Sequence, residues 1–192
     1  MGMNQSGQPP IADFMSRVVA WIIDGVILGI AGQIVWAIVF AILPLGIDVL
    51  VQAIAVAAIS AGYFIYMWTT RKQTVGMMLM KLQVQKDGTG AALNQSEAIR
   101  RWLYLGLPLA LATLISVGGG FSFFAFGGLG GLAILFTLAS IAALVAIVWE
   151  IYLAYATNND ARKQGPHDKA AGSVVVAIGP SPLAGMGGQK PS

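Results

Sequence analysis

The sequence predicts an all-α membrane protein with four transmembrane helices, and three observations lead to this fold class. First, 57% of the 192 residues are hydrophobic and only 10% are charged, whereas a soluble domain carries about 25% charged residues. Second, the chain contains long uncharged stretches, and a helix needs about 20 apolar residues to cross a bilayer. Third, all 11 Lys and Arg residues fall on one side of a four-span layout, as expected when basic loops stay in the cytoplasm.

Three uncharged stretches give the number of spans: residues 25–47, 49–70 and 102–149. The first two are long enough for one span each, and the third is long enough for two, with its glycines supplying the break. Pro44 ends the first span, because proline cannot donate the backbone hydrogen bond of a continuing helix. In chain order, the predicted spans cover residues 14–43, 47–68, 99–117 and 132–156.

The distribution of basic residues predicts the orientation in the membrane. They lie at the start of span one, between spans two and three, and after span four: Arg17; Arg71, Lys72, Lys81, Lys86, Arg100 and Arg101; Arg162, Lys163, Lys169 and Lys190. We therefore expect a protein of the cytoplasmic (inner) membrane, with both termini and the central loop on the cytoplasmic side. Such a basic inner face would suit anionic lipid headgroups, although the charges are explained more simply as topology signals.

The central loop, residues 69–98, is predicted to contain a short interfacial helix and a strand. Thr74 has the position of an N-cap for a helix over residues 75–81. Residues 82–85 alternate apolar and polar side chains, which is typical of a strand. Residues 173–178 have strong strand propensity and lie on the same side of the membrane. We expect these two segments to pair into a small two-stranded sheet.

The remaining soluble segments complete the layout. Asn94 and Glu97 have the spacing of a helix capping box, and the helix that starts there would carry Arg100 and Arg101 at the surface. The Gly-, Gln- and Pro-rich residues 1–12 are predicted to form a flexible tail, and residues 179–192 a disordered one. The transmembrane domain is then expected to cover residues 13–178, with a lipid bilayer as its main partner.

Arg17 and Asp24 are charged residues within the first predicted span. They are seven residues apart, which places them on one helix face, about 10 Å apart along the axis. Charged groups inside lipid usually face a bundle interior, a partner or a water-filled cavity. Asp24 could bind a cation or a proton, or it could form an internal salt bridge with Arg17. For Arg17, we favour this salt bridge, with the side chain reaching toward the headgroups.

Glu150 is the second carboxylate in a predicted span, near the inner end of span four. It could join Asp24 in a possible ion or proton site, or simply reach the inner interface. The chain has no cysteine and a single histidine, His167, so we expect no metal site, no cofactor and no catalytic constellation. Nothing resembles a nucleic-acid recognition helix or a basic-aromatic groove, and an enzyme is not expected.

Three segments together resemble the RDD family of bacterial membrane proteins. They are Arg17-Val-Val-Ala-Trp-Ile-Ile-Asp24; Gln73-Thr-Val-Gly76 with Leu82-Gln-Val84, Asp87-Gly88 and Ala98-Ile-Arg100; and His167-Asp-Lys-Ala-Ala-Gly-Ser-Val-Val-Val176. The arginine and two aspartates that name the family match Arg17, Asp24 and Asp168. This chain departs from the family pattern at Met77 and Met78, where a basic residue is frequent, and at Ser173, where threonine is more usual.

Two functional hypotheses follow. The resemblance implies a transport role, including cation/proton exchange, which has been suggested for some members of the family. In that case Asp24 would bind the ion, Arg17 would set its charge balance and Asp168 would act from the cytoplasmic side, with a homo-oligomer providing the path. Alternatively, the chain is a non-transporting module that docks or stabilises a partner complex, and these residues only hold it together. A wet, carboxylate-lined cavity would favour transport, and a dry, paired Asp24 would favour the structural role.

Overall fold

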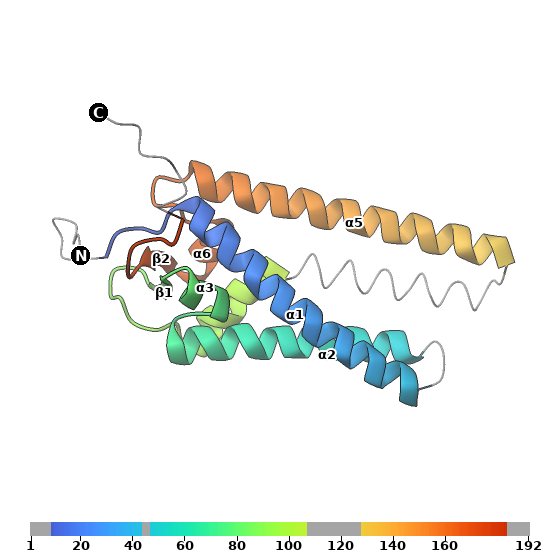
Figure 1. Cartoon of the computed structure of the whole chain (residues 1–192). Helices are drawn as coiled ribbons and strands as arrows, with labels where there is room; N and C mark the ends of the chain where they lie inside the picture. The colour runs from blue at the N-terminus through green and yellow to red at the C-terminus, as the bar shows by residue number, and fades with distance from the viewer. Residues whose placement is uncertain (1–8, 44–46, 107–127, 184–192) are drawn as a thin grey trace.

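A computed structural model describes residues 9–43, 47–106 and 128–183. Its longest elements are the helices α1 (Phe14–Ile42), α2 (Ile47–Tyr66) and α5 (Gly128–Asn159). These helices extend from a small folded end of the molecule, where the two strands and two short helices gather (Figure 1). The ranges Phe14–Ile42, Val51–Arg71 and Phe136–Asn159 are long and apolar enough to cross a membrane.

The predicted third span is described only at its start. Residues 95–106 are helical, and residues 107–117 lie outside the described residues, as does the predicted outer connection around 118–127. The described part of the chain therefore holds three candidate spans, and the helical membrane class is supported to that extent. The bounds of the first, second and fourth predicted spans agree with α1, α2 and α5 to within a few residues.

Burial along α1 is inverted relative to a helix of a soluble protein. Its buried residues are Ser16, Ala20 and Asp24, which are small or polar. Many of its large apolar side chains are exposed, including Trp21 and Ile30. Water would penalise this arrangement, whereas hydrocarbon would not, so the distribution indicates lipid around the helix.

The small sheet confirms the predicted pairing of two distant segments. Strand β1 (Leu82–Lys86) runs antiparallel to β2 (Ser173–Ala177), with Val84 opposite Val175. The other edge of β2 is covered by residues 10–12, where the Ala12 N–H donates to the Val175 carbonyl at 3.0 Å. Composition predicts a loose tail here. The free backbone groups of β2 instead pair with these residues, and residues 1–8 lie outside the described residues.

Capping residues define the ends of the short helices and of the 95–106 helix. Helix α3 (Val75–Leu79) begins at Thr74, whose side chain accepts a hydrogen bond from the Met77 N–H. Asn94 and Glu97 exchange side-chain-to-backbone bonds of 2.9 Å each, which is the reciprocal pattern of a capping box. Helix α6 (Pro166–Ala171) ends at Gly172, whose φ of 59° lets the chain reverse into β2.

We name α3, β1, α6 and β2 together the cap. A single hydrophobic core joins the cap to the neighbouring helix ends and to the short π-helix η1 (Met67–Arg71). Trp68 of η1 lies at its centre, 1% exposed. The buried members of this core are Ala12, Ala20, Trp68, Met80, Leu82, Val84, Leu93, Ala98 and Val175. The cap is thus packed against the helices rather than tethered to them by loops.

Candidate functional site

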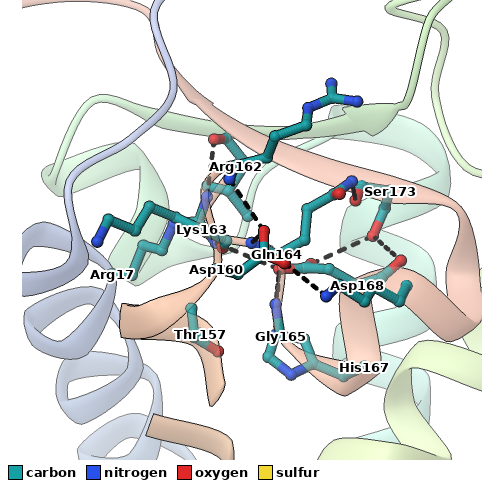
Figure 2. A network of polar contacts seen from close by, with 12 residues as sticks. Arg17, Thr157, Asp160, Arg162, Lys163, Gln164, Gly165, His167, Asp168 and Ser173 are labelled. Atoms are coloured by element: carbon teal, nitrogen blue, oxygen red, sulfur yellow. Dashed lines mark hydrogen bonds and ion pairs between the residues drawn. The ribbon is translucent and has the colours of Figure 1, made fainter. Parts of the chain in front are cut away.

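Asp168 is the centre of a buried ion-pair cluster. Its side chain is fully buried and lies 2.7 Å from Arg101 Nη2 and 3.2 Å from Arg17 Nη1. The Ser173 hydroxyl donates to Oδ1 at 3.2 Å. Figure 2 shows Gly165, His167 and Ser173 arranged around this carboxylate at the turn into α6. Asp168 therefore links two arginines from separate helices to the cap.

Arg17 also donates to two backbone carbonyls of the cap and its neighbouring loop. Its Nη1 donates to the Lys163 carbonyl at 2.5 Å and its Nη2 to the Val175 carbonyl at 3.0 Å. The side chain is only 10% exposed. The guanidinium therefore lies among carbonyls and a carboxylate of the protein, which take the place of water around it.

Arg101 contradicts a second expectation. The helix of residues 95–106 was predicted to carry Arg100 and Arg101 at the surface, but the side chain of Arg101 is 2% exposed. Besides Asp168, its guanidinium carbon lies 4.6 Å from the centre of the Trp68 ring, a cation–π contact. Adjacent residues on a helix point about 100° apart, so Arg100 remains exposed while Arg101 faces the core.

The electrostatics of the cluster favour an ionised Asp168 between two charged arginines, and a neutral histidine. Burial opposes the ionised form of Asp168, but the surrounding positive charges, with Arg101 foremost, and the Gly165 N–H together outweigh this effect and lower its pKa. Burial of the imidazole lowers the pKa of His167 to about 4, despite the proximity of Asp168. At neutral pH the cluster thus holds two cations and one anion, with His167 uncharged.

Asp24 is held by donors from two other elements. Oδ1 accepts from the Tyr63 hydroxyl at 2.6 Å and from the Gly76 N–H at 2.8 Å. Oδ2 accepts from the Thr74 hydroxyl at 2.5 Å. Asp24 is 2% exposed, so these three bonds replace its hydration and fasten α1 to α2 and α3.

The predicted salt bridge between Arg17 and Asp24 is wrong. Both residues are buried on the cap side of α1, but Arg17 pairs with Asp168 and Asp24 pairs with uncharged donors. Two turns of helix separate the pair, and each turn meets a different part of the cap. The nearer partners of each residue come from segments far along the chain.

Gly76 explains the tight fit beside Asp24. A Cβ at this position would lie 2.0 Å from the Ala20 carbonyl oxygen and 3.0 Å from Asp24 Cγ. Only glycine allows the start of α3 to approach α1 so closely. The Gln73-Thr-Val-Gly76 segment therefore supplies a side-chain donor, a backbone donor and the space that the carboxylate requires.

Glu150 makes no hydrogen bond or ion pair with Asp24 among the described residues, so the predicted polar cluster of two carboxylates does not form by direct contact. Both nevertheless line one cavity of about 340 Å³ between α1, α5, the 95–106 helix and the cap. Arg17, Arg101 and His167 line the same cavity. No cluster of metal-ligating side chains is found in residues 9–43, 47–106 and 128–183.

The model of the RDD family matches residues 11–172. The chain belongs to the RDD family. The matched range contains Arg17, Asp24 and Asp168, the residues that the sequence resemblance picked out, and it includes the candidate spans and most of the cap. No curated protein and no solved structure was found to match the chain.

Sequence reasoning missed three contributors to these clusters. The sequence predicts Arg101 at the surface and gives no functional prediction for Tyr63. Thr74 was recognised as a helix cap, but its bond to Asp24 was not foreseen. The sequence holds no signal for Arg101, because helical spacing does not show which side chains the cap covers. It holds none for the bonds of Tyr63 and Thr74 to Asp24 either, because these residues lie 39 and 50 positions away from it.

Proposed function

We propose that this RDD-family protein is a non-transporting membrane module that holds its cap against the cytoplasmic membrane face and docks a partner there. The main support is that the hydrogen-bonding capacity of the Asp24 carboxylate is used within the protein. Asp24 is 2% exposed and accepts three hydrogen bonds, from α2, from α3 and from the N-cap of α3. A carboxylate bound in this way acts as a latch between helices, because a cation would have to displace protein donors to reach it.

The position of the basic residues supports a cytoplasmic cap. Every Lys and Arg in the described residues lies in the cap, in a loop beside it or at an adjoining helix end. Basic segments are retained on the cytoplasmic side during insertion. The same residues would give the cap surface a positive potential at the membrane face.

The surface around the cap offers cations to a partner of acidic character. Arg71, Lys81 and Arg100 are exposed, and none of them forms an ion pair within the part of the chain that the structure describes. By contrast, Arg162 is already paired with Asp87 at 2.6 Å. Unpaired rim charges of this kind steer association and set partner choice.

The test is a quantitative pull-down from native membranes in a mild detergent. Wild-type protein should retain a defined partner, and the Arg71→Glu/Arg100→Glu variant should lose it without a change in thermal stability. Arg162→Glu is the matched control, because its charge is engaged with Asp87, and it should weaken the interaction less. Equal recovery of the partner by all three proteins would overturn the docking surface.

Cation/proton exchange is the second candidate, favoured by the cavity that both Asp24 and Glu150 line. The arginines on the same wall weaken this candidate, because they would repel an entering cation. Flux measurements in proteoliposomes separate the two functions. If purified protein exchanges cations for protons, and Asp24→Asn abolishes the exchange at unchanged protein folding, then the exchanger is correct and the non-transporting module is wrong.

A further inference from the structure

The cavity between α1 and α5 has an apolar wall of the kind that binds hydrocarbon. Its volume of about 340 Å³ lies at the lower end of the range of ligand sites. Most of the lining side chains are apolar, among them Phe14, Val18, Trp21, Leu105, Ile151 and Ala154. Trp21 and Ile151 are also 51% and 62% exposed, so the rim presents apolar surface to the surroundings of the helices.

The polar part of the cavity lining is incompletely bonded. Arg17, Trp68, Arg101 and His167 all line the cavity. These four residues carry all the buried side-chain nitrogens that lack a hydrogen-bond partner among the described residues: Arg17 Nε, Trp68 Nε1, Arg101 Nε and Nη1, and His167 Nδ1. Buried polar atoms are nearly always paired, and arginine nitrogens without a partner point to an acceptor that the chain itself does not supply.

The charge of this polar end is also unbalanced. Two arginines face one carboxylate, that of Asp168. Asp24 is occupied by its own three donors, and Glu150 bonds to neither arginine in the part of the chain described. An anion with several acceptor oxygens would satisfy both the charge and the open nitrogens, and phosphate matches guanidinium groups well.

We propose that this cavity binds an anionic phospholipid, with one acyl chain against the apolar wall and the phosphate bonded to Arg17 and Arg101. The location fits a lipid, because α1 and α5 approach each other near the cap and diverge away from it (Figure 1). The arginines then lie at the cap end of the spans, where headgroups are found. The phosphate would accept from the open nitrogens, Arg17 Nε and Arg101 Nε and Nη1, so both arginines keep their bonds to Asp168.

The test uses the full chain in detergent, with phosphatidylglycerol and phosphatidylcholine of identical acyl chains and with inorganic phosphate. Retained lipid is counted by native mass spectrometry, and affinity is taken from the lipid-dependent thermal shift. Both lipids carry the phosphate, but the choline group of phosphatidylcholine brings a further cation beside the two arginines. Phosphatidylglycerol should therefore bind about tenfold more tightly. Equal affinity for the two lipids, or an equal shift with inorganic phosphate alone, would overturn the site.

Variants locate the binding in the cavity. Ala154→Phe fills the apolar wall without changing charge and should abolish the retained phosphatidylglycerol. Ala143→Phe, at an exposed position about three turns away along the same helix and outside the cavity lining, should leave it unchanged. Glu150→Gln removes the competing negative charge and should strengthen binding. Binding that survives Ala154→Phe, or that weakens in Glu150→Gln, contradicts the proposal. Neither result depends on the docking partner proposed above.

Discussion

Arg101 donates to Asp168 across 2.7 Å, joining two residues separated by 67 positions in a contact where both side chains are nearly inaccessible. Arg17 approaches the other carboxylate oxygen of Asp168 at 3.2 Å. Two of the three residues that name the family thus meet each other, and the pairing is completed by an arginine outside that set. The third, Asp24, fastens a different contact on the same helix.

Asp168→Asn is expected to destabilise the protein by about 3–5 kcal/mol, because removing one member of a buried ion pair leaves the partner charges uncompensated. Here two arginines would lose their carboxylate. The measurement is thermal or denaturant unfolding in a fixed detergent. Asp87→Asn is the control: its pair with Arg162 is solvent-exposed, and little change is expected. If both variants lose a similar amount of unfolding free energy, burial of the Asp168 cluster does not explain its contribution to stability.

Gly76→Ala should destabilise the contact between α3 and α1. The new Cβ would lie 2.0 Å from the Ala20 carbonyl oxygen, so one backbone must move, at a cost of about 1–3 kcal/mol or more. Gly62→Ala on α2 is the matched control, because a Cβ there meets nothing within 4 Å. That substitution should be neutral or mildly stabilising. Unfolding curves of the two variants, recorded side by side, check the difference.

Tyr63→Phe should cost about 1.5–3 kcal/mol, because the hydroxyl makes one bond to a charged group and a second to the backbone. It donates to Asp24 and accepts from the Val75 N–H at 2.9 Å. Tyr66→Phe removes the same atom from a tyrosine that is 60% exposed and should have almost no effect. If the two variants unfold at the same temperature, the bond from Tyr63 to Asp24 does not stabilise the contact between α1 and α2.

The protein should become less stable as the pH falls from 6.5 to about 4, because of His167. The pKa of this side chain is lowered by burial from 6.5 to about 4. Between these values the unfolded chain binds a proton that the folded chain does not, so stability is complete above pH 6.5 and declines toward pH 4. The loss is on the order of 3 kcal/mol. Unfolding measured across this range in wild type and His167→Gln checks the prediction, since the variant should lose most of the slope.

Elements that depend on local pattern were predictable from the sequence. Hydropathy placed α1, α2 and α5, because the apolar length needed to cross a bilayer is a property of each segment alone. Capping chemistry placed the starts of α3 and of the 95–106 helix at Thr74 and Asn94, because a cap bonds within three residues. The strand pair was predictable for a similar reason: both segments had strand propensity and shared one side of the membrane.

Which groups pair with the buried charged side chains was decided only by the tertiary structure. Arg17 and Asp24 are correctly spaced for one helix face, but helical spacing cannot tell which distant segment will cover that face. The cap covers it, giving Asp168 to Arg17 and giving Thr74 and Gly76 to Asp24. Arg101 became buried for the same reason. In this protein, the sequence by itself determined which segments prefer hydrocarbon and where helices begin, because those depend on neighbouring residues. The pairing of buried charges depended on how the cap folds back on the helices, because an isolated charge in low dielectric takes whichever partner the chain brings close.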